Sequence, residues 1–190
     1  MNALQLIADW QPQTTYALSE TETQTRKVKS GSKVWRNPRL SFEVLPDPKI
    51  APDEVLLHVT AVGICGSDMH MYEAGADGYM LYPGLTRFPN TLGHEFSGRV
   101  LEVGGEVAQG ARGLQRGDLV AVEEVNWCGV CDACRRGLVN HCTQMEEIGF
   151  TTPGAMAQQI SVKAKYCWKL TEIAERLGSE REAADRKSVV

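Results

Sequence analysis

The sequence has no long apolar run, no excess of basic residues and no leader-like start. No stretch approaches the roughly twenty apolar residues that span a bilayer. The first residues, MNALQLIADWQPQ, have no basic head, sustained apolar run or small-residue cleavage site. The formal net charge of -4 argues against a polyanionic partner. We therefore expect a soluble cytoplasmic protein that binds neither nucleic acid nor membrane.

Four of the six cysteines, Cys128, Cys131, Cys134 and Cys142, lie together in the segment CGVCDACRRGLVNHC. Two-residue gaps let consecutive thiolates turn onto one ion, and the longer gap closes the tetrahedron from the far side of a loop. Disulfides are rare in the cytosol. We expect a loop over residues 126–143 held by a structural zinc with no open coordination position. A chance cluster or two disulfides are the alternatives.

A second group of chemically active side chains is split between two segments. GICGSDMH contains Cys65 at the end of an apolar run, and GHEFSG contains His94 and Glu95 before another strand-like stretch. Thiolate, imidazole and carboxylate all suit zinc, and three or fewer protein ligands leave room for a substrate oxygen. A single Cys or His is more often a packed core residue, so neither segment decides the question alone.

Taken in order, GICGSDMH, GHEFSGRVLEVG and CGVCDACRRGLVNHC resemble the zinc-containing medium-chain alcohol dehydrogenase family. The resemblance runs from about Leu56 to about Leu170. Within the family, GSKVWRNP, YMLYPGLTRFPNTLGHEFSG and AKYCWKL are most similar to bacterial cyclitol enzymes, the scyllo-inosose dehydrogenases. The resemblance implies two zinc ions per chain, one structural and one catalytic, and an NAD or NADP cofactor in the full-length parent.

The resemblance also assigns roles to individual residues. It implies that Cys65 and His94 bind the catalytic zinc, with Glu95 as a third or alternating ligand. Ser67 matches the hydroxyl that takes the proton of the substrate alcohol, and His70 matches a position that passes this proton towards solvent. Asp68 matches a carboxylate that orients the imidazole ligand. Alternatively, Ser67 and Asp68 form an ordinary polar turn, and His70 is a solvated loop residue.

Residue periodicity and the resemblance together predict a mainly β fold. Val55, Leu57, Val59 and Ala61 alternate along residues 54–62, as in a strand with one buried face. FSGRVLEVG, DLVAVEEV and AMAQQISVKAKYCWKL read as further strands. The resemblance names the fold as a GroES-like, partly open β-barrel with short helices and the zinc-binding cysteine loop.

The sequence departs from the family in its nucleotide-binding part. No GxGxxG motif is present, and only about twenty residues follow Leu170. We expect residues 1–170 to form the catalytic domain, with 19–39 a surface loop, and 171–184 to start a helix leading to a missing Rossmann domain. Residues 185–190 read as a non-native tail. The family's further zinc-associated glutamate has no convincing match among Glu172, Glu175, Glu180 and Glu182.

Substrate class is inferred from two acids before the cysteine loop, Glu123 and Glu124. A carboxylate there favours a polyhydroxylated substrate, because a buried acceptor is left unpaired by an alkyl group; paired surface acids are the alternative. We expect the fragment of a zinc-dependent NAD(P) dehydrogenase acting on a secondary alcohol, a polyol or cyclitol, inactive alone and homo-oligomeric at full length. The other possibility is a standalone zinc-stabilised binding module without redox activity.

Overall fold

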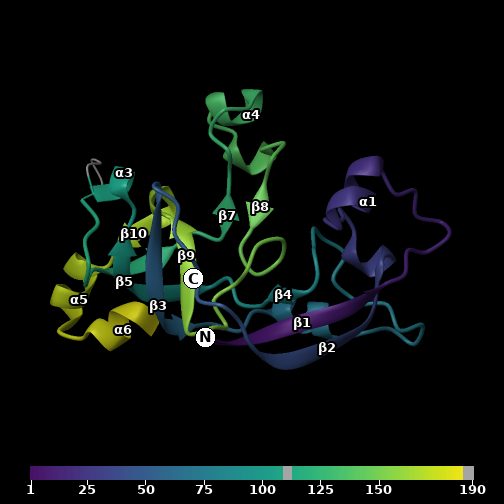
Figure 1. Ribbon diagram of the computed structural model, residues 1–190, viewed down its shortest axis with the longest axis horizontal. Helices are drawn as coiled ribbons and strands as arrows, with labels where there is room; N and C mark the ends of the chain where they lie inside the picture. The colour runs from purple at the N-terminus through teal and green to yellow at the C-terminus, as the bar shows by residue number, and fades with distance from the viewer. Residues whose placement is uncertain (109–112, 186–190) are drawn as a thin grey trace.

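The computed structural model describes residues 1–108 and 113–185, and its strands pair antiparallel in three sheets (Figure 1). The sheets have the strand orders β2-β1-β4, β10-β6-β5-β3-β9 and β7-β8. Residues 186–190, most of the expected non-native tail, lie outside the described part. The strands are β1 (Asn2–Trp10), β2 (Trp35–Val44), β3 (Glu54–Val62), β4 (Asn90–Thr91), β5 (Phe96–Val103), β6 (Leu119–Val122), β7 (Val125–Asn126), β8 (Glu146–Glu147), β9 (Gln159–Lys163) and β10 (Cys167–Lys169).

The helices are short and connect or cover these sheets. Within the described ranges, no helix has the length and apolar character needed to cross a bilayer. The α-helices are α1 (Glu20–Thr25), α2 (Gly66–Tyr72), α3 (Gly105–Ala108), α4 (Asp132–Arg135), α5 (Thr171–Leu177) and α6 (Glu180–Asp185), and the 3-10 helices are η1 (Gly31–Lys33), η2 (Val139–His141) and η3 (Ala164–Tyr166).

The predicted strand at residues 54–62 is β3, at the same bounds. Val55 and Leu57 are fully buried in a core formed mainly by residues of the five-stranded sheet, and Val59 packs against the same core. The register with β5 shifts between Val59 and Ala61, and Ala61 packs against a different cluster beneath α6. A bulge therefore splits one alternating face between two cores.

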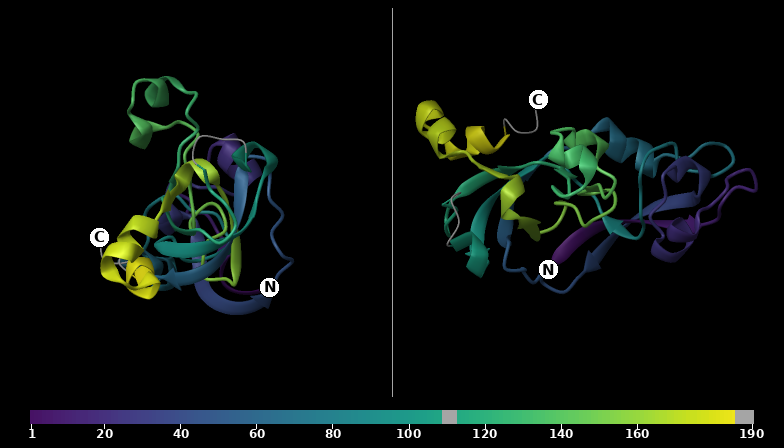
Figure 2. Two further views of the ribbon diagram at one scale, coloured as in Figure 1. Left: turned by 90° about the vertical axis from the view of Figure 1, so that its left-hand side faces the viewer. Right: turned by 90° about the horizontal axis from the view of Figure 1, so that it is seen from above.

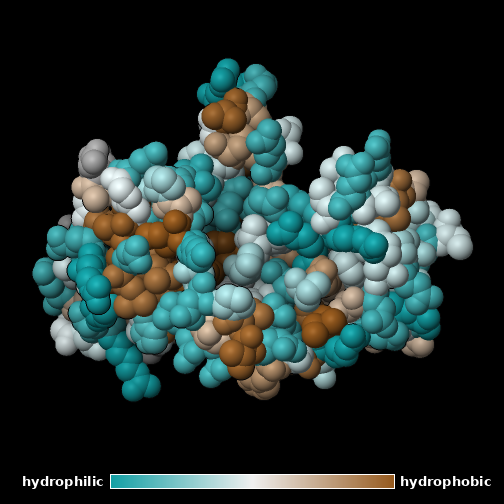
Figure 3. All heavy atoms as spheres, viewed as in Figure 1, coloured by the Kyte–Doolittle hydropathy of each residue, from teal (hydrophilic) through white to brown (hydrophobic). Residues whose placement is uncertain are grey.

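The two larger sheets lie at opposite ends of the molecule, and the two-stranded sheet projects from between them (Figure 1). The β2-β1-β4 sheet and α1 lie at one end, and the five-stranded sheet with α5 and α6 lies at the other (Figures 1 and 2). Between them the β7–β8 ribbon carries the loop that contains α4 away from the body. On the face shown in Figure 3, apolar residues gather over the end that holds the five-stranded sheet.

The predicted single helix over residues 171–184 is two helices in the structure. Gly178 ends α5 in the left-handed conformation, with φ at 64°, and α6 starts two residues later. Ala183 and Ala184 of α6 are buried against the sheet, whereas Ile173 of α5 is 45% exposed. The glycine lets the chain turn so that a second short helix covers the sheet.

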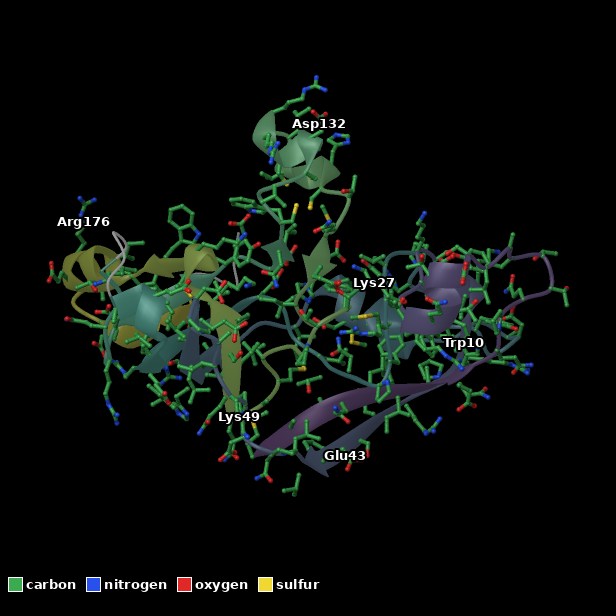
Figure 4. All side chains as sticks on the ribbon, turned by 45° about the horizontal axis from the view of Figure 1, so that its top comes forward. Trp10, Lys27, Glu43, Lys49, Asp132 and Arg176 are labelled. Carbon is green, nitrogen blue, oxygen red and sulfur yellow. The ribbon has the colours of Figure 1, made fainter. Side chains whose placement is uncertain are left out.

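The segment 19–39, predicted as a surface loop, contains α1, η1 and the start of β2. Ser19 and Glu22 form a reciprocal capping box at the start of α1. Glu22 is 5% exposed and Val28 is fully buried, so the segment has a small packed interior. Its Lys27 binds Glu146 of β8 through an ion pair of 2.8 Å, which ties this end of the molecule to the central ribbon (Figure 4).

Candidate metal centres

Strand pairing explains how Cys65 and His94 meet although they are far apart in sequence. In the β3–β5 pair, Val62 lies opposite Phe96. Cys65 comes three residues after Val62, and His94 comes two residues before Phe96. Both residues therefore lie just beyond the same end of the β3–β5 strand pair. Cys65, His94 and Glu95 place one candidate ligand atom each within 4.8 Å of the others. The structure therefore brings together the three residues expected at the catalytic zinc.

The two ring nitrogens of His94 face different neighbours. Nδ1 lies 3.6 Å from Asp68 Oδ1, while Nε2 lies 3.4 Å from Ser67 Oγ and 3.9 Å from Glu124 Oε2. His94 is 3% exposed, and its ring centroid is 4.7 Å from that of Phe150. Burial alone would lower the pKa of His94, but Asp68 and Cys65 beside the ring outweigh burial and raise it to about 9.

Asp68 lies between the backbone of Cys65 and the imidazole of His94. It is 4% exposed, and its Oδ2 accepts a hydrogen bond of 2.9 Å from the Cys65 backbone N–H. Among the described residues, Asp68 Oδ1 and His94 Nδ1 have no hydrogen-bond partner, although they are buried and nearly within hydrogen-bond distance of each other. A small rotation of the imidazole would join them, as when a carboxylate fixes a metal-ligating histidine.

The remaining donors fit a divalent cation. Hydrogen bonds from Ser67 and then His94 lower the pKa of Cys65, which favours the thiolate that binds zinc. One thiolate, one imidazole and one carboxylate form a donor set that zinc accepts, and the buried, unpaired nitrogen of His94 is the kind of group that metal binding would orient. The residues present therefore fit a zinc ion.

His70 lies apart from this cluster. It sits one turn after Ser67 in α2 with an exposed side chain, and its Nδ1 lies 3.3 Å from Glu73 Oε2. The structure thus brings Ser67 and Asp68 to His94 but leaves His70 at the surface. Its expected role in passing a proton towards solvent stays a prediction.

The four cysteines of the projecting loop converge as expected from their spacing. The sulfur atoms of Cys128, Cys131, Cys134 and Cys142 all lie within 4.8 Å of one another, and each thiol is free. The loop contains Gly129 and Gly137 in the left-handed region, with φ at 80° and 79°. In Figure 4, Asp132 marks its outer end.

Backbone amides point at these sulfur atoms. Cys128 N–H donates to Cys142 Sγ at 3.3 Å, and Cys131 N–H donates to Cys128 Sγ at the same distance. Backbone N–H groups lower the pKa of Cys128 and of Cys131, whereas burial and the neighbouring sulfurs raise the pKa of Cys134. All four thiols can ionise together only if a cation balances the charge, so this donor set also fits zinc.

Comparison with known proteins now decides the family. The family model described as the alcohol dehydrogenase GroES-like domain matches residues 51–172. The chain belongs to this alcohol dehydrogenase family. The scyllo-inosose 3-dehydrogenase of Thermotoga maritima is 44% identical over 176 residues, which are 91% of this chain and 45% of that protein. The chain therefore spans about half the length of the curated relatives it matches.

Solved structures of alcohol dehydrogenase relatives share the fold. A Thermotoga maritima chain described as an alcohol dehydrogenase superposes with a TM-score of 0.93 at 42% identity, covering 98% of this chain and 48% of that one. A zinc-binding dehydrogenase from Sinorhizobium meliloti, solved with NADP, has a TM-score of 0.55 at 29% identity and covers 75% of this chain and 36% of that one. The GroES-like fold expected from the sequence is confirmed.

The structure separates the two acids that precede the cysteine loop of this alcohol dehydrogenase domain. Glu124 Oε2 lies 3.9 Å from His94 Nε2, on the side of the first metal centre. The charge of Glu123 instead affects Tyr166. Burial and then this charge raise the pKa of the Tyr166 phenol. Of the two acids, Glu124 is therefore the one that borders the candidate site.

No sequence pattern singles out Glu147, which the structure brings near Glu124 because the next residue, Ile148, donates its N–H to the Glu124 carbonyl at 3.0 Å. Burial and then the Glu124 charge raise the pKa of Glu147, and both acids raise the pKa of Tyr82, which burial already raises, to about 12. Glu147 reaches this position because β8 pairs with β7, with Glu147 opposite Val125. No motif around Glu147 signals this, because the approach depends on pairing across the cysteine loop.

A large cavity lies away from the first metal centre. It has a volume of about 910 Å³ and is lined by Trp127, Ile160, Val162 and Tyr166 among others, but not by Cys65 or His94. It borders the cysteine loop through Cys128 and Val130. Its apolar walls hold no thiolate–imidazole pair, so the donor clusters, and not the cavity, mark the candidate chemistry of this domain.

Proposed function

We propose that this chain is the catalytic domain of a zinc-dependent dehydrogenase that oxidises a secondary alcohol and transfers the hydride to NAD or NADP. The observation that carries the proposal is the cluster of Cys65, His94 and Glu95, with ligand atoms within 4.8 Å of one another. Family membership supports it, as do the relatives, which include a cyclitol dehydrogenase and a zinc-binding dehydrogenase solved with NADP.

The residues of the first centre would have two different roles, binding the metal and orienting its ligand. Cys65, His94 and Glu95 would hold the zinc, and Asp68 would orient His94 from the other side of the ring. The bound ion would act as a Lewis acid on the hydroxyl oxygen of the substrate. Burial of His94 and Asp68, at 3% and 4% exposure, keeps water away from this side of the site and strengthens the electrostatic interactions there.

Ser67 is the residue best placed to receive the proton of the substrate hydroxyl. Its Oγ lies 3.4 Å from His94 Nε2, on the same side of the imidazole as Glu124. A hydroxyl can accept one proton while donating another, so Ser67 can relay the substrate proton without ionising. His70, which lies on the same helix with its side chain exposed, would release the proton to solvent.

The four-cysteine centre would have a structural role. Four thiolates complete a tetrahedral zinc site and leave no position for a substrate. The amide–sulfur hydrogen bonds of this loop fix the sulfur positions, and the loop is joined to the body by the two-residue strands β7 and β8. A structural zinc would supply the stability that so short a ribbon lacks.

For the substrate we propose a polyol or cyclitol. Glu124 presents an acceptor beside His94, and a carboxylate in a partly dry site favours a ligand with further hydroxyl groups over an alkyl alcohol. The relative from Thermotoga maritima is named for a cyclitol substrate. Glu147, whose pKa is raised by burial and then by the Glu124 charge, adds a second carboxyl group near Glu124, which increases the preference for hydrogen-bonding ligands.

The test is a chimera that joins this chain to the remaining length of the Thermotoga maritima relative, assayed beside the chain alone. We expect the chimera to reduce NAD or NADP with inositol or sorbitol and the chain alone to reduce neither. Replacing Cys65 with Ser in the chimera should abolish turnover. A chimera that binds zinc and nucleotide but oxidises none of these alcohols contradicts the proposed function. Turnover by the chain alone contradicts the proposal that this chain is only the catalytic domain of the enzyme.

A further inference from the structure

An exposed apolar stripe runs along β2. Leu40, Phe42 and Val44 alternate along the strand and are 43%, 87% and 82% exposed. They lie on one face, because alternate residues of a strand point to the same side. Phe42 also lines a shallow groove together with Leu4 and Met156. A stripe of this kind leaves apolar surface in contact with water unless another surface covers it.

The backbone groups of these three residues point away from the sheet. β2 is the outer strand of the β2-β1-β4 sheet (Figure 1). Met1 and Leu45 exchange two backbone hydrogen bonds, of 2.6 and 2.9 Å, and the β1–β2 register continues regularly from there to Arg39. The odd-numbered residues of this stretch therefore bond to β1, and the even-numbered ones turn their N–H and C=O groups outwards. Within the described ranges, residues 39–44 have strand partners only in β1.

Two features limit the part of β2 that can pair with another strand. Asn37 is in the left-handed region, with φ at 52°, and Pro38 has no N–H to donate. At the other end the strand stops at Val44. The outward residues between these ends carry neither a charge nor a proline, which are the usual protection of an edge strand. The stretch that can pair, residues 38–44, has Ser41 at its centre.

The charges on the other face of this stretch suit a second copy of the same strand. Arg39 and Glu43 lie two residues before and two residues after Ser41. If two copies pair antiparallel about a two-fold axis through Ser41, Arg39 of each copy lies opposite Glu43 of the other. Leu40 then lies opposite Phe42, and both already turn their hydrogen-bonding groups outwards. A different register would separate Arg39 from Glu43, so the charges select this one.

We propose that two copies of this chain associate through β2, with the two strands antiparallel and centred on Ser41. The pairing joins the two three-stranded sheets into one continuous sheet. Arg39 already lies 3.1 Å from Asp9, but both side chains are about half exposed and a guanidinium has several N–H donors, so Arg39 can also bind Glu43 of the second copy. Both candidate metal centres lie outside β2, so the inference does not depend on the proposed function.

Sedimentation equilibrium of the purified chain tests this with two charge reversals. Arg39→Glu and Glu43→Arg each place like charges opposite one another at both charged positions of a homodimer. We expect the wild type to dimerise and each variant alone to have a dimer dissociation constant at least about tenfold higher. An equimolar mixture of the two variants should associate as tightly as the wild type, because opposite charges again meet at both positions.

Two further comparisons support the test. Phe42→Ser should weaken the dimer, whereas Ile173→Ser, at a position of α5 that is 45% exposed, should match the wild type. Circular dichroism checks that each variant is folded. If a single charge reversal fails to fold, the double variant Arg39→Glu/Glu43→Arg replaces it, because it restores both opposite-charge pairs and should dimerise like the wild type.

Three results would overturn the inference. The first is a wild type that stays monomeric up to about 1 mM. The second is a dimer that neither charge reversal nor Phe42→Ser weakens, because the copies would then meet through another surface. The third is a mixture of folded variants, or a folded double variant, that associates no more tightly than a single reversal alone.

Discussion

Glu22 provides a sharp test of how the segment before β2 is held. Its carboxylate is buried and accepts hydrogen bonds from Tyr16 Oη at 2.6 Å, Lys29 N–H at 3.0 Å and Ser19 N–H at 2.9 Å, with Ser19 Oγ adding a fourth at 2.8 Å. Replacing Glu22 with Gln keeps the shape of the side chain but removes the charge and turns an amide NH₂ towards these donors. We expect the variant to lose stability.

The size of the loss follows from the pKa. Burial would raise the pKa of Glu22, but hydrogen bonds from Lys29, Tyr16 and Ser19 outweigh burial and lower it from 4.5 to about 2. This difference corresponds to about 3 kcal/mol of folding free energy. Because the folded-state pKa lies below the unfolded one, the stabilisation is fully present above about pH 4.5 and is lost as the pH falls towards 2.

The measurement compares urea denaturation of the wild type and Glu22→Gln over this pH range. Tryptophan fluorescence reports on the region, because Trp10 packs beside Trp35 and Arg26. The ring centroids of Trp10 and Trp35 are 5.1 Å apart, and the Arg26 guanidinium carbon lies 4.2 Å from the Trp10 ring centroid. We expect a difference of about 3 kcal/mol at neutral pH that shrinks towards zero near pH 2. The difference between the two proteins removes the contribution of other acids.

Glu20 provides the matched control on the same helix. It is exposed, and its Oε1 accepts a single bond of 3.0 Å from Gln24 Nε2. Glu20→Gln should change stability by less than about 0.5 kcal/mol at any pH. The reasoning about Glu22 is wrong if Glu22→Gln and Glu20→Gln behave alike, or if the loss from Glu22→Gln is as large at low pH as at neutral pH.

Three further predictions concern the metal centres and the packing around them. Asp68→Asn should weaken zinc binding at the first centre about 10- to 100-fold in competition with a chromophoric chelator, and unchanged affinity would show that Asp68 does not orient His94. Cys142→Ser should remove one zinc per chain by elemental analysis and lower the unfolding temperature of the loaded protein; retention of both ions would refute the four-thiolate site. Gly154→Ala should cost about 1–3 kcal/mol in chemical denaturation, because its Cβ would lie 2.3 Å from the Leu92 carbonyl oxygen. Gly66→Ala, with nothing within 4 Å of its Cβ, should lose no stability, and equal behaviour of the two variants would contradict the packing argument.

Local sequence was sufficient for β3 and for the cysteine loop, but it did not predict β1 or β2. Alternation over residues 54–62 predicted β3 at its bounds, because a strand with one buried face repeats every two residues. The four cysteines lie within one short segment, so the loop that joins them can bring their sulfurs together without help from the rest of the chain. The helix α1 in segment 19–39 was not predicted, because the polar composition of the segment indicated a surface loop. The structure shows a capping box there, formed by Ser19 and the buried Glu22.

The sequence by itself determined which side chains could bind zinc and that residues 54–62 would form a strand, because both depend on residue type and short-range spacing. Only the tertiary structure decided that Cys65 and His94 meet, through the pairing of Val62 with Phe96. It also decided that Glu124 lies beside His94, whereas the charge of its neighbour Glu123 raises the pKa of Tyr166. The two acids lie in the bend between β6 and β7, outside both strands, so their surroundings depend on which parts of the chain pack beside the bend.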